Sequence, residues 1–143
     1  MITRRDDGYE IATDPDRLDV DLLHHWLSTD TYWARGRSRE KVEQSIGASL
    51  NFGVYDATGA QAAYARVVTD LTTFAWLCDV YVDRAHRGKG LGTWLATTVR
   101  DHLAPYGIRR ALLATQDAHG VYAKAGFGPL PDPAHMMIMT FDR

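Results

Sequence analysis

The sequence contains almost no cysteine. Cys78 is the single thiol among 143 residues, so the chain has no pair with which to form an internal disulfide. This cysteine lies in a strongly apolar segment, where a small buried hydrophobic residue is a more common role than a nucleophile. A chain without disulfides suits a reducing compartment, so we expect a cytoplasmic protein.

Long apolar runs and a large charge excess are also missing. No apolar run approaches the ~20 residues of a membrane span, and residues 1–8 lack the apolar core of a signal peptide. The formal net charge of −2 argues against a general nucleic-acid binder. His24 and His25 have no partners at metal-ligand spacing, so we predict no metal. The length suits one domain, residues 1–143.

Hydrophobic periodicity predicts a mixed α/β sheet with helices on both faces. The expected strands are 9–13, 50–55, 61–69, 74–82, 110–115 and, after Phe127, 136–141. Segment 74–82 has apolar residues at both its odd- and its even-numbered positions. This pattern is typical of a central strand that is covered on both faces. Asp14-Pro15 is expected to start a first helix that ends near 28–30, and Ser38 to cap a second. Asp117 is expected to cap a short helix through Lys124, with Gly126 just past its end.

The most informative segment lies between 74–82 and a third helix. Its glycines, Gly88, Gly90 and Gly92, stand at alternate positions, and Leu91, Leu95, Val99 and Leu103 then recur every four residues. The loop therefore lies at a helix N-terminus, where free N–H groups and the helix dipole attract anions such as pyrophosphate. Glycines here could instead form only a tight turn. The nearby cations favour the anion site; they are Arg84, His86, Arg87 and Lys89.

Two common phosphate-binding motifs are excluded. No Gly-Lys-Ser or Gly-Lys-Thr occurs, so the loop is not a Walker A motif. Thr93 replaces the third glycine of the dinucleotide fingerprint, and no acidic residue follows at the expected distance.

Two segments together resemble the GNAT superfamily of acyl-CoA-dependent N-acyltransferases. Arg87-Gly88-Lys89-Gly90-Leu91-Gly92 is similar to the pyrophosphate loop of that superfamily, and Tyr122, followed by Gly126-Phe127, resembles its late tyrosine helix. The order of the predicted elements extends the resemblance over nearly the whole chain. It implies a mainly antiparallel mixed sheet with a splayed central strand, and it is compatible with a homodimer.

The resemblance implies acetyl-CoA as the cosubstrate. The backbone of the loop would hold its pyrophosphate, and Val80 and Val82 would bind the pantetheine arm as an added strand. Tyr122 would protonate the departing thiolate as a general acid, a role that suits a phenol because its pKa exceeds that of a thiol.

The general base and the acceptor site are less defined. Trp76 stands where some family members carry a glutamate base. Asp79 or Asp70 could act through water, or each could be a structural hydrogen-bond acceptor. His119 is a third candidate, or an exposed helix residue. The family usually forms its acceptor wall between the first two helices, where this chain has Tyr32, Trp33, Arg35 and Arg37. These residues could bind an amine that carries a carboxylate, or form a packed loop with solvated arginines.

The sequence therefore predicts an N-acetyltransferase that acts on a primary amine of a small molecule or peptide by direct attack. Two alternatives stay open. One is a non-catalytic acyl-CoA-binding or sensing module. The other is an acetyltransferase of a macromolecular amine such as an aminoacyl-tRNA, against which the acidic charge balance counts.

Overall fold

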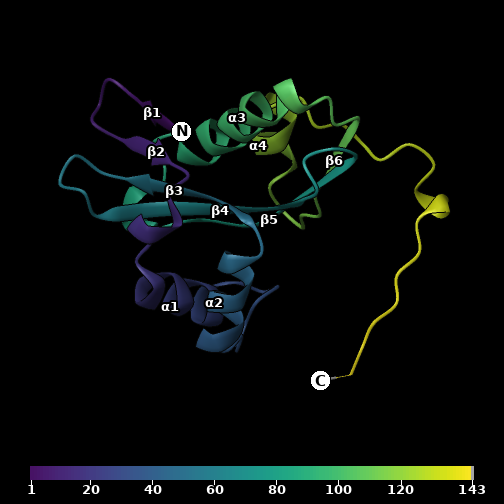
Figure 1. Cartoon of the computed structure of the whole chain (residues 1–143), viewed down its shortest axis with the longest axis horizontal. Coiled ribbons are helices and arrows are strands. Elements are labelled where there is room, and N and C mark those ends of the chain that lie inside the picture. Colours follow the sequence, from purple (N-terminus) through teal and green to yellow (C-terminus); the bar gives the residue numbers. More distant parts are fainter. Residues whose placement is uncertain (143) are drawn as a thin grey trace.

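The computed structural model describes residues 1–142 and has three layers. A six-stranded sheet lies between α1 and α2 on one face and α3 and α4 on the other (Figure 1). The strands, which keep the order of the chain across the sheet, are β1 (Ile2–Arg4), β2 (Glu10–Ala12), β3 (Leu50–Tyr55), β4 (Gln61–Thr69), β5 (Phe74–Val82) and β6 (Arg110–Leu112). The helices are α1 (Val20–Asp30), α2 (Arg39–Gly47), α3 (Leu91–Leu103) and α4 (His119–Lys124). The predicted mixed α/β class is confirmed.

Neighbouring strands pair antiparallel except β5 and β6, which run parallel and are joined by the crossover through α3. The bounds predicted for β3, β4 and β5 are confirmed. As predicted for 74–82, β5 is an interior strand that pairs with β4 and β6 and contacts α1 and α3, although it lies second from the edge; after the exposed Phe74, its residues alternate between buried and half-buried. β1 was not predicted from the sequence.

Polar caps set the starts of the first two helices. Asp14 and Pro15 begin a short 3-10 turn, Pro15–Arg17, rather than α1 itself. Asp19 then caps α1 by accepting a hydrogen bond from the Leu22 N–H at 3.1 Å. Ser38 caps α2 as predicted, accepting from the Lys41 N–H at 3.2 Å. No helix formed by residues 1–142 is both long enough and apolar enough to cross a membrane.

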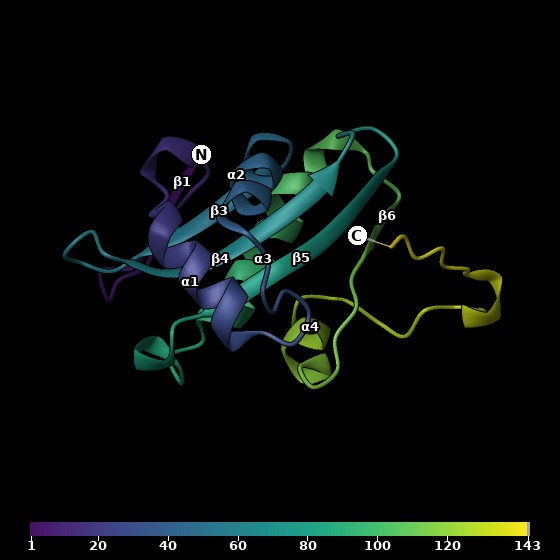
Figure 2. The same ribbon diagram turned by 90° about the horizontal axis from the view of Figure 1, so that it is seen from below.

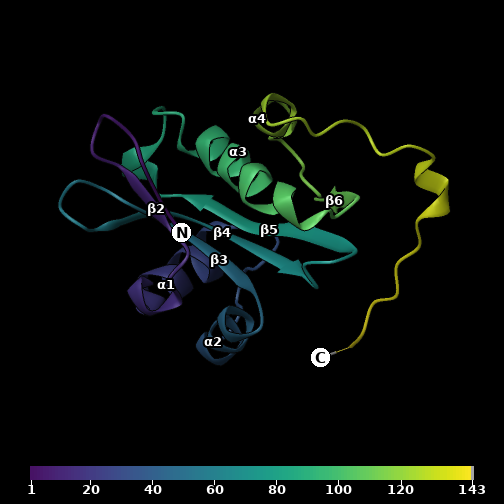
Figure 3. The same ribbon diagram turned by 45° about the horizontal axis from the view of Figure 1, so that its top comes forward.

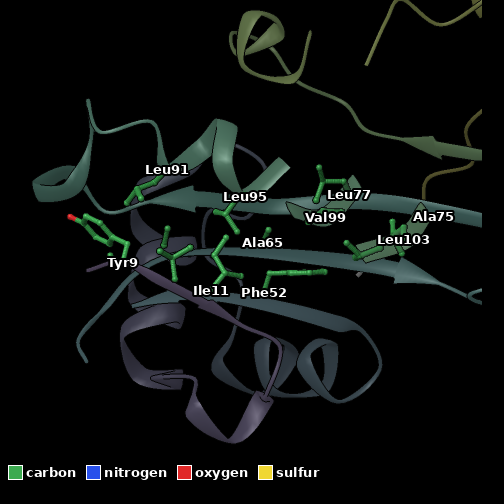
Figure 4. Close-up of a cluster of buried hydrophobic side chains, with 14 residues drawn as sticks. Tyr9, Ile11, Phe52, Ala65, Ala75, Leu77, Leu91, Leu95, Val99 and Leu103 are labelled. Atoms are coloured by element: carbon green, nitrogen blue, oxygen red, sulfur yellow. The ribbon is translucent and has the colours of Figure 1, made fainter. Parts of the chain in front are cut away.

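The larger core lies between the sheet and α3. The predicted stripe of Leu91, Leu95, Val99 and Leu103 is buried along its whole length. It packs on side chains of the sheet such as Phe52, as Figure 4 shows, while Figure 3 shows α3 running across the sheet. Burying this apolar area stabilises the pairing of helix and sheet. The N-terminus of α3 is thereby fixed against the end of β5.

A second core joins α1 and α2 to the opposite face, seen from below in Figure 2. Its buried members are Leu18, Leu23, Trp26, Leu27, Ala34, Val42, Tyr64 and Tyr81. The Trp26 and Tyr81 rings stack with centroids 5.1 Å apart. This contact positions the end of α1, and hence the loop after it, beside β5.

The C-terminal third differs from the prediction in three places. β6 ends at Leu112 rather than at 115. Asp117 does not cap α4: Ala118 is the cap residue, and its N–H donates to Thr115 Oγ1 at 3.1 Å. Gly126 does take the predicted left-handed turn, with φ of 103°. Residues 136–141 form no strand in the described chain because no neighbouring strand supplies hydrogen bonds to their backbone.

Candidate active site

The glycine loop connects β5 to α3 and takes backbone conformations that suit glycine. Gly88 and Gly90 have φ of 81° and 75°, and Gly90 is the cap residue of α3 with no side chain to satisfy the first N–H groups. No atom lies within 4 Å of the point where a Cβ on Gly88 would stand. The loop thus forms an open cradle of backbone donors at the positive end of a 13-residue helix, which is a site for an anion.

Several cationic side chains belong to the segment that forms this cradle, and one acidic residue makes ion pairs with two of them. Asp30, the last residue of α1, pairs with Arg84 and lies 3.6 Å from the Arg87 guanidinium. The hydrogen bond from Arg84, then that from the Tyr81 hydroxyl, holds the pKa of Asp30 well below its ordinary range. In the part of the chain that the structure describes, Lys89 has no carboxylate partner.

Arg5 also lies near the loop, and its guanidinium is paired with Asp7 at 2.5 Å. Its guanidinium lies over the Trp94 ring, 5.1 Å from the centroid, and it is the nearest side chain to a Cβ built on Gly90. It comes from the β1–β2 turn, far from the loop in sequence. No motif marks it, because only the fold brings the two segments together.

β5 and β6 separate toward the glycine loop. Only Phe74–Trp76 pair with Arg110–Leu112, while β5 continues to Val82. The stretch that holds Val80 and Val82 thus has no strand beside it on that edge. A cavity of about 1110 Å³ lies along the separation, and its wall includes Leu77, Val99, Thr115, His119 and Tyr122. The predicted splayed strand is confirmed.

A β-bulge lies in the middle of β5. Tyr64 pairs with Tyr81 and Arg66 with Cys78, so Asp79 and Val80 together oppose a single residue of β4. Asp79 has φ of 50°, which is unusual for a residue other than glycine. The extra residue changes which side chains face each layer. Leu77 and Val80 both pack on the α3 side, whereas Tyr81 packs with α1 and α2.

Asp79 is held by three side chains. Its Oδ1 accepts from Trp33 Nε1 at 2.9 Å, and its Oδ2 accepts from Arg37 at 2.6 Å and from Arg66 at 2.9 Å. The carboxylate is 2% exposed. Burial alone would raise the pKa of Asp79, but the two guanidinium groups outweigh it and hold the pKa below its ordinary value. Through Trp33 and Arg37, this cluster of hydrogen bonds and ion pairs holds the bulge of β5 against the loop between α1 and α2.

The α1–α2 loop carries the residues expected in the acceptor wall. Tyr32 and Trp33 pack edge to face with ring centroids 4.9 Å apart. The Tyr32 hydroxyl accepts from the Gln116 N–H at 3.0 Å, which ties the loop to the connection before α4. Arg35 is exposed and has no ionic partner within residues 1–142, whereas Arg37 is engaged by Asp79. Of the predicted acceptor residues, Trp33 and Arg37 therefore contact β5, and Tyr32 contacts the connection before α4.

Tyr122 lines the cavity from α4. Burial, with smaller contributions from Tyr32 and Asp117, raises its pKa to about 12. Its ring packs edge to face on Phe127, with centroids 6.1 Å apart. The hydroxyl donates no hydrogen bond to any residue that the structure describes. Tyr122 therefore presents a protonated phenol to the cavity over the physiological pH range.

The other base candidates lie elsewhere or are exposed. Asp70 is in the turn before β5, at the opposite end of that strand from the glycine loop, and accepts from the N–H groups of Thr72 and Thr73. The hydrogen bond from the Thr73 hydroxyl, followed by these two backbone bonds, holds the pKa of Asp70 well below the ordinary range. His119 lies on the cavity wall but is exposed. No group of acidic, histidine and cysteine residues able to hold a metal occurs within 1–142.

Comparison with known proteins identifies the family to which this chain belongs. The model of the acetyltransferase (GNAT) family matches residues 20–127, which is more than half of the chain. The chain belongs to the GNAT family of acetyltransferases. Its match therefore includes α1, the bulge in β5, the glycine loop and Tyr122. This supports the family resemblance drawn from the loop and the late tyrosine helix.

The individual relatives are also described as acetyltransferases. A "putative acetyltransferase" from Gibberella zeae is 30% identical over an alignment of 135 residues, and the match covers 81% of this chain and 76% of that protein. A crystal structure of a GNAT-family protein from Xanthomonas campestris superposes with a TM-score of 0.88 at 42% identity, covering 94% of each chain. An acetyltransferase from Clostridium acetobutylicum, solved with acetyl-CoA, shares the fold with a TM-score of 0.65 at 14% identity over 98% and 96% of the two chains.

Proposed function

We propose that this GNAT protein transfers an acetyl group from acetyl-CoA to a primary amine of a small molecule or peptide. The observation that supports this most directly is the cradle at the N-terminus of α3. Gly88 and Gly90 leave its backbone donors open, and Lys89, which has no carboxylate partner in the described chain, adds positive charge. The negative charge of a pyrophosphate suits this cradle.

The donor would extend from the cradle along the open edge of β5. Val80 and Val82 would offer backbone groups to the pantetheine amides in the manner of an added strand. The Val82 carbonyl accepts from Arg87 Nε at 2.9 Å, so it lies beside the loop that would hold the pyrophosphate. We place the thioester near Tyr122, which lines the cavity beside β5.

The reaction is a direct exchange of bonds at the thioester carbon. The neutral amine nitrogen forms the new C–N bond, the C–S bond breaks, nitrogen loses one proton and sulfur gains one. An acceptor that arrives as an ammonium ion first gives one further proton to solvent, so one proton is released overall. We assign Tyr122 to the sulfur side, where its phenol donates a hydrogen bond and then a proton to the leaving thiolate. Its raised pKa keeps the phenol protonated before the transfer, and the phenolate then takes up a proton from solvent.

We propose that Asp79 is a structural hydrogen-bond acceptor rather than the general base. Both of its oxygens accept hydrogen bonds, and its lowered pKa makes it a weak proton acceptor. Asp79 is then a positioning residue that fixes Trp33 and the acceptor wall, and solvent takes the proton from the incoming ammonium. Tyr32, Trp33 and Arg35 would contact the acceptor.

Calorimetric titration with acetyl-CoA tests the donor site. Gly90→Glu adds a carboxylate to the cradle, and Gly107→Glu is its matched control because Gly107 has a φ of 73° at the other end of the same helical segment. We expect micromolar binding by the wild type and Gly107→Glu, and at least a tenfold loss in Gly90→Glu. The proposal is rejected if the wild-type protein does not bind acetyl-CoA when it is folded and free of copurified cofactor.

Turnover is tested by the release of free CoA thiol with a panel of primary amines. Activity on small amines or peptides supports the proposed function. Binding of acetyl-CoA without turnover on any amine would favour the non-catalytic module instead. Activity on aminoacyl-tRNA that nuclease treatment abolishes, without activity on free amines, would favour the macromolecular acceptor.

A further inference from the structure

A side chain of the glycine loop is bonded to the Val82 carbonyl at the end of β5. The Asp83 N–H donates to the Ala62 carbonyl at 2.9 Å, so Val82, one residue earlier, turns its own N–H and C=O away from β4. These groups point to the edge of β5 that stays open beyond the paired residues Phe74–Trp76. On that edge, Arg87 Nε donates to the Val82 carbonyl at 2.9 Å. The acceptor that pantetheine would use at Val82 is thus already engaged.

Two further contacts hold the Arg87 guanidinium in this position. It lies over the Tyr81 ring, 5.4 Å from the centroid, and its Nη2 is 3.6 Å from Asp30 Oδ2. Asp30 is fixed in turn, because its Oδ2 accepts from the Tyr81 hydroxyl at 2.6 Å and from Arg84 Nε at 2.8 Å. The Arg87 side chain is nevertheless 48% exposed. It is therefore held by polar contacts only, and it can leave without unpacking the core.

The guanidinium also stands where an added strand would run. Such a strand would lie about 4.8 Å from β5, and Arg87 Nε, 2.9 Å from the Val82 oxygen, falls within that strip. A pantetheine chain can follow the edge past Val82 only after this side chain has moved. The segment that carries Arg87 continues directly into the cradle at Gly88 and Gly90. A phosphate bound there offers the guanidinium a second anionic partner beside its own backbone.

We propose that Arg87 couples the two halves of the donor site: a pyrophosphate in the cradle draws the guanidinium off Val82, and the pantetheine edge of β5 then opens. This coupling rests on the acetyl-CoA site proposed above and adds a selection step to it. Thioesters of pantetheine that lack the pyrophosphate meet an engaged carbonyl and bind weakly. Because linkage is reciprocal, pyrophosphate and pantetheine each raise the affinity for the other. Arg87 is then a specificity-determining residue that favours coenzyme A thioesters over simpler ones.

Free pantetheine and inorganic pyrophosphate, used as separate probes, test this coupling without any turnover. Chemical-shift titration of the isotopically labelled full chain gives the Kd for pantetheine, with and without saturating pyrophosphate. We expect pyrophosphate to lower this Kd at least about fivefold in the wild type, which is the lower end of typical coupling between sites. In Arg87→Met the edge is open from the start. Its Kd for pantetheine alone is therefore expected to be at least about fivefold lower than that of the wild type, and pyrophosphate should no longer change it.

Lys89→Met is the matched control, because it removes one charge from the same loop while the bond between Arg87 and Val82 stays in place. Its Kd for acetyl-CoA is expected to rise, whereas saturating pyrophosphate should still lower its Kd for pantetheine as in the wild type. A wild type that binds no acetyl-CoA rejects the proposed function itself. Binding of acetyl-CoA without coupling between the two probes, or with the same coupling in Arg87→Met, rejects only the role of Arg87. Pantetheine binding too weak to detect in Arg87→Met contradicts an open edge and rejects that role as well.

Discussion

Trp33 Nε1 donates a hydrogen bond to Asp79 Oδ1 at 2.9 Å, which joins the α1–α2 loop to the bulge of β5. The same bulge brings Val80 and Val82 onto the α3 side of the sheet. The proposed acceptor wall and the proposed pantetheine edge are thus positioned by one buried carboxylate. Residues 46 positions apart in sequence meet here.

Replacement of Asp79 by asparagine is expected to destabilise the fold by about 3 kcal/mol. Removing one partner of a buried ion cluster leaves the others without compensation, and here two guanidinium groups lose their counter-charge. Urea unfolding monitored by circular dichroism measures the free energy of unfolding. Asp21→Asn is the control, because its ion pair with Arg39 is largely exposed and should leave stability nearly unchanged. Equal stability of Asp79→Asn and wild type would show that the cluster contributes little.

The contribution of Asp79 should also depend on pH. Its folded pKa lies below its unfolded value of about 3.9, so the unfolded chain takes up the proton first as the pH falls. The stabilisation is therefore complete above about pH 5 and decreases as the pH falls through the unfolded and then the folded pKa. Unfolding measured from pH 7 to pH 3 should show the gap between wild type and Asp79→Asn narrowing. A gap that widens in acid would contradict the direction of the shift.

Tyr122→Phe is expected to lower kcat about 100-fold while leaving the Kd for acetyl-CoA within twofold. Loss of a positioned proton donor typically costs two to four orders of magnitude in rate, whereas the phenyl ring keeps its packing on Phe127. Steady-state kinetics and calorimetry measure the two quantities. Tyr106→Phe, on an exposed ring after α3, is the control. An unchanged kcat would remove Tyr122 from the chemistry.

Arg35 is expected to select acceptors that carry a carboxylate. It is exposed in the α1–α2 loop and lacks an ionic partner in the described chain, so its guanidinium is available. Arg35→Ala should raise KM about tenfold for an amino acid but leave KM for the corresponding carboxamide unchanged, since a charge-assisted hydrogen bond contributes about 1.5 kcal/mol. Arg39→Ala, on α2, is the control. Equal effects on both acceptors would make Arg35 a general contact only.

Local patterns predicted the parts of the fold that depend on local forces. The four-residue spacing of Leu91 to Leu103 located α3 because one face of a helix must be buried. The alternate glycines located the loop because left-handed φ angles favour glycine at Gly88 and Gly90. The loop, together with Tyr122 and the following Gly126-Phe127, carries the family signature, so the family could be predicted before the fold.

Long-range features were not accessible in the same way. Asp79 was a candidate only as the nearest strand carboxylate, and nothing local indicates that Arg66 and Arg37 converge on it. Arg5 reaches the loop through the pairing of β1 with β2. Segment 136–141 has the composition of a strand, but a strand needs a neighbour, and the described chain supplies none. Each of these depends on tertiary contacts rather than on periodicity.

Cys78 should be nearly inert toward alkylation in the folded protein. Burial raises the pKa of its thiol to about 11. The thiolate is the reactive form, and a thiol of pKa 11 is about a thousandth ionised at pH 8, against about a quarter for an ordinary thiol of pKa 8.5. Iodoacetamide at pH 8 is therefore expected to modify Cys78 at least 100-fold more slowly in the native protein than in urea. Mass spectrometry follows the reaction.

Ala48→Cys supplies an internal standard for that reaction. Residue 48 is exposed at the end of α2, so its thiol should react within the native protein at the rate of an unfolded cysteine, while Cys78 in the same molecule stays unmodified. Native Cys78 that reacts as fast as the standard would show that the strand beside the bulge opens readily. Because Cys78 directly precedes Asp79, such opening would also loosen the contact between Asp79 and Trp33.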